Sequence, residues 1–182
     1  MEFIVVIAII LLLVIILAAI IRVVNKVNKL KIKIEESHSS IEIALVKRYD
    51  VIKQSFECAK GYAAHEKEIF SKLIEVRKGM SVEQLQQVAE TQNRALTSLR
   101  ATMEAYPNLK ADSLFSNLQN QLAVENEHFA ASKRVYNSNV SVYNQYVVAF
   151  PVCVIASMVG GTKKDFFKEE DLENKRNISF DF

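Results

Sequence analysis

The residues best suited to metal chemistry are two Glu-x-x-His motifs, Glu35–His38 and Glu125–His128. Di-iron helix bundles hold their metals with two such motifs at one height and two further carboxylates. Along the helices expected here, His38 lies about 40 Å from His128 at helical rise, so this ligand requirement is not met. We therefore expect no metal site. A metal-binding or enzymatic helical bundle that uses the Glu125/His128 region is kept as the alternative function.

Acid–base or nucleophilic catalysis needs a histidine beside a nucleophile and a third group that orients it. Neither His65 nor His128 has such partners at helical spacing. The sequence also contains no glycine-rich phosphate loop, no Gly-x-Ser-x-Gly and no His-Glu-x-x-His motif. We predict no catalytic residue, no cofactor and no enzymatic activity.

A repeated Tyr-Asn pair offers recognition chemistry instead. Tyr136-Asn137 and Tyr143-Asn144 are seven residues apart, so each residue type recurs on one helical face after two turns. A tyrosine buries its ring and keeps its hydroxyl for a partner, and an asparagine amide bridges to a neighbouring helix. Together with Phe150-Pro151, the two pairs form the predicted partner or packing surface.

Charged side chains also fall on the apolar stripes of the expected helices. A buried charge is costly unless it is paired, so we predict a buried polar network of Glu66, Arg94 and Glu125, which come level on three helices. This network would set the helix register. Alternatively, the stripes are narrow and these long side chains reach water. Arg48 and Asn139 are further polar residues at core-side positions.

Apolar residues at steps of three and four predict helices through the rest of the chain. The first is expected to run from the membrane to about Lys78, with Gly79 as its C-terminal cap. Ser81 and Gln84 form a capping box for the second helix, which Pro107 ends.

Asp112 or Ser113 caps a third helix, which continues to Phe150. A short apolar helix over residues 152–159 follows, and it either folds back over the end of the third helix or leaves that end to another chain. No alternating pattern or hairpin dipeptide predicts a strand. We therefore predict an all-α fold: an N-terminal transmembrane helix, then an up-and-down antiparallel bundle of three long helices plus a short C-terminal helix.

The transmembrane helix is predicted from Phe3 to Ile21, nineteen residues without a polar side chain. Its helical length is about 28 Å, close to the thickness of a bilayer's hydrocarbon core. The run is longer than a signal-peptide core and follows Glu2 rather than a basic residue, so we expect a retained single-pass helix in the cell membrane. Basic residues directly after it place the N-terminus outside and the helical domain in the cytoplasm: Arg22, Lys26, Lys29, Lys31 and Lys33.

The net charge and the cysteine content of the chain limit the classes of partner that we expect it to bind. A net charge of +2 creates no field for nucleic acid, so we expect none to bind. Cys58 and Cys153 lie far apart in the sequence and are expected to be free thiols in a reducing compartment. The expected partners are the lipid bilayer, an unidentified membrane protein and a second copy of this chain.

Several motifs in order resemble the LemA family over most of the chain, from Met1 to about Phe167. They are Lys47-Arg48-Tyr49-Asp50, "KGYAAHE" from Lys60, "EAYPNLKAD" from Glu104 and "YNSNVSVYNQYVVAFP" from Tyr136. A proline that the family usually carries a few residues after Asp50 is absent here.

The resemblance implies a membrane-anchored helical bundle without known enzymatic activity. Some relatives are associated with membrane metalloproteases and others with membrane organisation. From the anchor, the helices without catalytic groups and the Tyr-rich end of the third helix, we predict an interaction or scaffold protein of the cell envelope. The expected domains are a transmembrane anchor (1–22), a basic juxtamembrane stalk (23–36), a LemA-like helical bundle (37–161) and a C-terminal tail (162–182).

Overall fold

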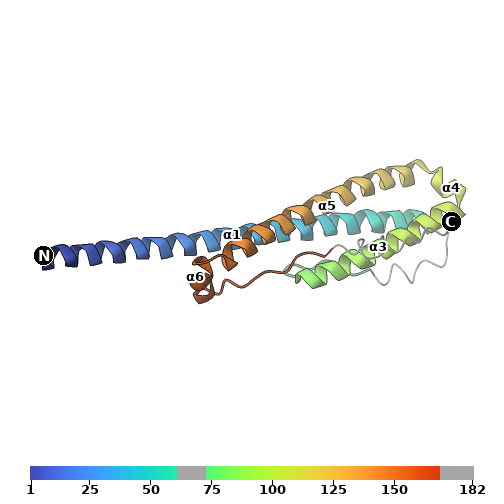
Figure 1. The fold of residues 1–182 in the computed structure, drawn as a ribbon. Helices are drawn as coiled ribbons and strands as arrows, with labels where there is room; N and C mark the ends of the chain where they lie inside the picture. Colours follow the sequence, from blue (N-terminus) through green and yellow to red (C-terminus); the bar gives the residue numbers. More distant parts are fainter. Residues whose placement is uncertain (61–72, 169–182) are drawn as a thin grey trace, which may run out of the picture. The chain divides into compact units, whose positions relative to one another are not determined.

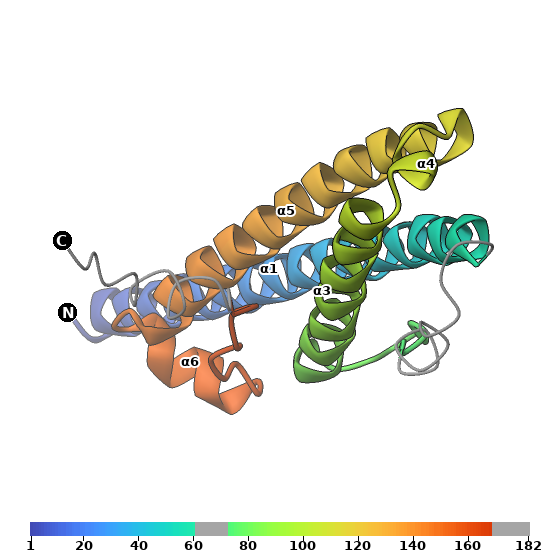
Figure 2. The same ribbon diagram turned by 90° about the vertical axis from the view of Figure 1, so that its right-hand side faces the viewer.

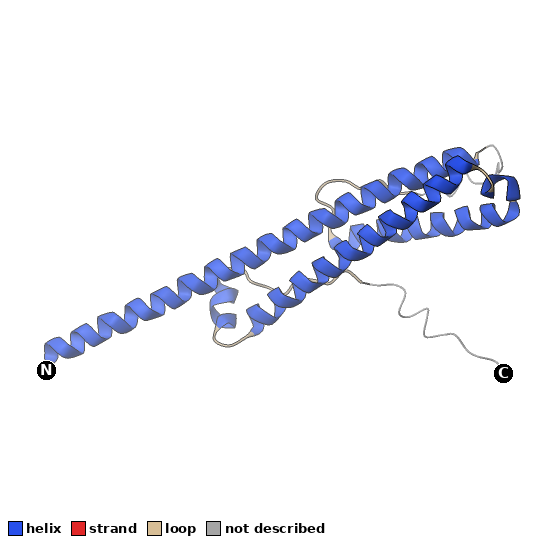
Figure 3. Ribbon diagram, turned by 90° about the horizontal axis from the view of Figure 1, so that it is seen from above, coloured by secondary structure: helices blue, strands red, loops and turns tan. Residues whose placement is uncertain are grey.

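The computed structural model of the 182-residue chain describes residues 1–60 and 73–168. Within these residues all regular structure is helical, which confirms the predicted all-α class (Figures 1 and 3). The helices are α1 (Glu2–Ala59), α3 (Val82–Ala105), α4 (Pro107–Lys110), α5 (Ser113–Val148) and α6 (Val152–Met158). The chain falls into two compact units, which are described separately.

Helix α1 changes character along its length. Its N-terminal part is long and apolar enough to cross a membrane, and none of that part is buried inside the structure. From Val27 onward, α1 buries a residue at every third or fourth position, as a packing helix does. The helix is continuous through this change.

The first unit combines residues 1–37 with residues 135–165. In this unit the last part of α5 runs antiparallel to α1 (Figures 1 and 3). The Nδ2 of Asn139 donates a hydrogen bond of 3.1 Å to the carbonyl oxygen of Lys33, which sets the register of the two helices. The buried apolar residues alternate by three and four on each helix: Val27, Leu30 and Ile34 on α1, and Tyr136, Val140, Tyr143 and Val147 on α5.

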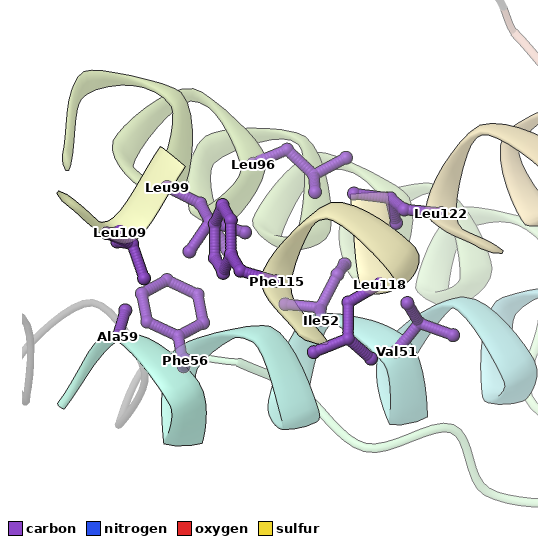
Figure 4. Close-up of a cluster of buried hydrophobic side chains, with 11 residues drawn as sticks. Val51, Ile52, Phe56, Ala59, Leu96, Leu99, Leu109, Phe115, Leu118 and Leu122 are labelled. Carbon is purple, nitrogen blue, oxygen red and sulfur yellow. The ribbon is translucent and has the colours of Figure 1, made fainter. Parts of the chain in front are cut away.

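The second unit contains residues 38–134 and the segment that starts at Phe166. Helix α4 links α3 to α5 (Figures 1 and 2). Phe56 of α1, Leu99 of α3 and Phe115 of α5 point into a common apolar cluster (Figure 4). Burial of each such side chain contributes about 1.5–3 kcal/mol, so this cluster stabilises the unit.

Two of the predicted helix starts are confirmed in this unit. Ser81 and Gln84 form the capping box of α3: the side chain of each accepts a hydrogen bond from the other's backbone N–H. Asp112 Oδ1 accepts hydrogen bonds from the backbone N–H groups of Leu114 and Phe115 and so caps the start of α5. These contacts satisfy N–H groups that have no partner within the helix.

The prediction that the first helix continues to about Lys78 is wrong, because α1 ends at Ala59 and residues 73–77 are not helical. Gly79 is not a helix cap either. It lies in a turn with a φ of 80°, and its N–H donates a hydrogen bond of 2.9 Å to Glu42 Oε1. Contacts to α1, such as the 3.2 Å hydrogen bond from the Tyr49 hydroxyl to Glu75, prevail over the local helical pattern here.

Candidate interaction site

The two tyrosines of the repeat lie on the buried face of α5, in different polar surroundings. The Tyr136 hydroxyl donates a hydrogen bond of 3.1 Å to the carbonyl oxygen of Asp165. The Tyr143 side chain is 0% exposed, and its hydroxyl has no hydrogen-bond partner in the described part of the chain. Burial raises the pKa of Tyr143 above its ordinary value, so this hydroxyl stays neutral at physiological pH.

The asparagines of the repeat are partly exposed, and Asn144 holds a later segment of the chain. Its Nδ2 donates a hydrogen bond of 2.9 Å to the carbonyl oxygen of Lys164, and its Oδ1 accepts one of 2.8 Å from the Lys164 N–H. Asn137 lies one turn after Lys133 on α5 and is likewise half-buried. The segment after α6 therefore returns to α5 and is attached to it through Tyr136 and Asn144.

Phe150 and Pro151 lie at the corner between α5 and α6, and both are exposed. Helix α6 is bent by 104° from α5, and Ala156 is its buried residue. The chain does return to α5, as the predicted fold-back requires. The segment that is hydrogen-bonded to α5 is Lys164–Asp165.

A buried guanidinium is the main polar feature of the second unit. Arg48 is 4% exposed, and its Nη2 donates a hydrogen bond of 2.6 Å to Asn93 Oδ1. The guanidinium also lies 5.4 Å from the ring centroid of Phe129, and burial lowers its pKa from the ordinary value to about 10. Its Nε and Nη1 have no hydrogen-bond partner among the described residues.

Phe129 connects this guanidinium to the segment after α6. Its ring packs edge-to-face on Phe167 with centroids 5.8 Å apart, and Lys133 Nζ lies 5.0 Å from its centroid. Gln92 adds a second buried polar group by donating a 3.0 Å hydrogen bond to the carbonyl oxygen of Leu45. One feature of the sequence indicates this packing: Phe166 and Phe167 are two adjacent aromatic residues within an otherwise charged segment.

No hydrogen bond or ion pair joins the two members of the predicted polar network that lie among the described residues, Arg94 and Glu125. Arg94 is exposed on α3 and forms an ion pair with Glu90, one turn earlier on the same helix. Glu125 is half-buried, and its Oε2 has no hydrogen-bond partner in the part of the chain that is described. Glu66 lies outside the described residues, so the three-residue network stays a prediction.

The alternative function, a metal-binding bundle that uses Glu125 and His128, requires several ligand side chains close together. Within residues 1–60 and 73–168, no group of three or more His, Cys, Asp or Glu side chains is placed to hold a metal ion. His38, from the first Glu-x-x-His motif, lies 3.8 Å from Glu42 across one turn of α1. His128 is exposed on α5.

An open groove lies between α1 and α5 in the second unit, with a volume of about 660 Å³. Leu114 and Leu118 supply its apolar side, and Asp50, Lys53 and Glu57 supply charges of both signs. Leu114 is largely exposed. A groove with an apolar floor and a polar rim suits a peptide or helix of a partner protein better than a small anion.

The fold defines a class: an all-α protein whose first helix is long and apolar enough to cross a membrane. The LemA family model matches residues 37–182, and the chain belongs to the LemA family. The chain is also 22% identical over 146 residues to Protein LemA of Metamycoplasma hominis. That match covers 78% of this chain and 67% of the relative.

Proposed function

We propose that this chain is a membrane-anchored, non-catalytic interaction protein, or scaffold, of the cell envelope. The observation that carries the proposal is the continuity of α1, whose exposed apolar part passes without a break into the packing helix of both units. An apolar helix that is continuous with a packing helix tethers the folded part of the chain to the bilayer. The groove beside Leu114 is the surface that we assign to a protein partner.

Membrane orientation follows from charge. Five basic residues stand between Ile21 and Glu35, and Lys and Arg are retained on the cytoplasmic side. The N-terminus is therefore outside and the helical units are cytoplasmic. The resemblance to LemA proteins favours a partner among membrane metalloproteases or membrane-organising proteins, or a second copy of this chain.

Extraction of membranes at alkaline pH tests the anchor. The full chain should stay with the lipid, and its intact mass should include residues 1–21. Leu12→Glu combined with Leu13→Glu should release it, because two carboxylates at the centre of the span oppose insertion. Glu2→Gln is the matched control and should stay with the lipid. Recovery of the unaltered chain in the soluble fraction would refute the anchor.

Photo-crosslinking in cells tests the partner surface. A photoreactive amino acid at Leu114 should give a discrete adduct with a membrane protein or with a second copy. The same amino acid at Val124, which is exposed on α5 but does not line the groove, should give none. Equal adduct patterns at both positions, or none at Leu114, would remove the groove from the proposal.

A further inference from the structure

The corner between α5 and α6 exposes apolar side chains that no described part of the chain covers. Phe150 is 85% exposed, Met158 is 82% exposed and Val154 is 55% exposed. Val154 and Met158 lie one turn apart on α6, while Ala156 is buried. Residues 135–162 contain no charged side chain, so no charge of this segment opposes entry of the corner into an apolar environment. Exposed apolar clusters of this kind mark contact surfaces.

The register of the first unit places this corner beside the end of the membrane anchor. The Asn139–Lys33 hydrogen bond sets residue 139 level with residue 33 on the antiparallel helix α1. Each residue forward on α5 is then level with one residue back on α1. Val147 comes level with Asn25, and Phe150 follows close to Arg22, the residue directly after the apolar run.

The C-terminal end of α6 is attached to α1 at Lys31, about 13 Å past Arg22 at helical rise. Lys31 Nζ donates hydrogen bonds of 3.4 Å to the carbonyl oxygens of Val159 and Gly160 at its C-terminal end. Because α6 is bent by 104° from α5, it lies close to the membrane plane when α1 and α5 stand along the membrane normal. An amphipathic helix in that orientation can bury its apolar face at the boundary between headgroups and acyl chains.

Basic side chains surround this corner. Arg22, Lys26 and Lys29 are exposed on α1, and Lys163 and Lys164 follow α6. Near a bilayer, such residues interact with anionic headgroups while the apolar residues between them enter the interface. This charge pattern favours a lipid surface over a protein as the occupant.

We propose that the α5–α6 corner is a second membrane contact, in which Phe150, Val154 and Met158 enter the interface of the bilayer that α1 crosses. The contact rests on the proposed anchoring by α1. It would restrict the tilt of the first unit, because the chain is then held to the bilayer at two points.

Tryptophan fluorescence tests this contact directly, because the chain contains no tryptophan. The full chain is reconstituted in vesicles of phosphatidylcholine and phosphatidylglycerol, with and without bromine on the acyl chains. The single variants Phe150→Trp and Met158→Trp report on the corner, and Leu12→Trp reports on the anchor. Val135→Trp is the control in water, since Val135 is exposed about 22 Å further along the helix at helical rise.

We expect Phe150→Trp and Met158→Trp to emit at shorter wavelength than Val135→Trp and to lose emission to brominated lipid, as Leu12→Trp does. Val135→Trp should lose none. If both corner variants emit as in water while Leu12→Trp is quenched, the corner contact is refuted and the anchor stands. If Leu12→Trp is not quenched, the anchor itself fails. A blue-shifted corner that brominated lipid does not quench would mean that protein covers it, which also overturns the proposal.

Discussion

At the residue scale, the two tyrosines of the repeat show that equal spacing does not give equal chemistry. Both rings are buried on the same face of α5, but only the Tyr136 hydroxyl has a described acceptor, the carbonyl oxygen of Asp165. A hydroxyl that is buried without a partner has lost its water without compensation. The two positions should therefore respond oppositely to removal of the hydroxyl.

Tyr136→Phe should lower the free energy of unfolding by about 0.5–1.5 kcal/mol, the net worth of one hydrogen bond. Tyr143→Phe should leave it unchanged or raise it by about 1–3 kcal/mol, because an unsatisfied group is removed. Denaturant unfolding of the full chain in mild detergent, followed by circular dichroism, measures both. Equal losses would show that the Tyr143 hydroxyl does have a partner.

Arg48 is the second residue whose surroundings predict the direction of a change in stability. Its folded pKa of about 10 lies below the ordinary value of an arginine, so the unfolded chain binds the proton more tightly. This penalty on folding is fully present at pH values well below 10 and is relieved as the pH rises above 10. At neutral pH the guanidinium is charged, and the change in pKa corresponds to about 3 kcal/mol.

Arg48→Met should therefore be at least as stable as the unaltered chain at neutral pH, because an apolar side chain avoids the desolvation cost and loses only the contacts to Asn93 and Phe129. Asn93→Ala keeps the buried charge and removes its hydrogen-bond acceptor, so it should cost about 1.5–3 kcal/mol. The shift in unfolding midpoint of each variant is the measurement. A large loss in Arg48→Met would mean that the guanidinium has a further partner.

At the scale of the element, the sequence predicted those helix ends that contacts between neighbouring residues determine. The start of α3 at Ser81 and of α5 at Asp112 could be read directly, because a cap needs only a side-chain oxygen and nearby N–H groups. The end of α1 could not be read. The apolar stripe continues past Ala59, while long-range contacts at Tyr49 and Glu42 hold residues 73–80 in another conformation.

The candidate site was predictable to a similar degree. The Tyr-Asn spacing indicated a functional face of α5, but not that Lys164 and Asp165 would be the groups attached to it. Those contacts involve backbone atoms of a segment without any motif. The partners of Arg48 were hidden for another reason: Asn93 and Phe129 lie on separate helices, and nothing in their local sequence distinguishes them.

The attachment of the segment after α6 gives a prediction for Asn144. Asn144→Ala removes both hydrogen bonds to Lys164, so trypsin should cut after Lys163 or Lys164 markedly faster than in the unaltered chain. Gln145→Ala is the matched control, because Gln145 is exposed and its hydrogen bond among the described residues is to Ser141 on its own helix. Equal cleavage rates in the two variants would show that Asn144 does not hold this segment.

At the scale of the whole molecule, a continuous α1 means that one membrane orientation decides the compartment of both units. Two free cysteines, Cys58 in the second unit and Cys153 in the first, can report on it. Burial and the Asp112 carboxylate raise the pKa of Cys58, so its reactive thiolate is scarcer at neutral pH. Each thiol is therefore examined alone: Cys153 in the Cys58→Ser variant, and Cys58 in the Cys153→Ser variant.

With the N-terminus outside, a membrane-impermeant maleimide should label neither variant in intact cells and should label both after permeabilisation. Glu2→Cys in a chain that lacks both native cysteines should be labelled in intact cells, because residue 2 precedes the apolar run. Slow labelling of Cys58 should accelerate as the pH rises, which separates low reactivity from protection by the membrane. Labelling of the native thiols in intact cells, together with protection of residue 2, would reverse the orientation and place the groove beside Leu114 outside the cell.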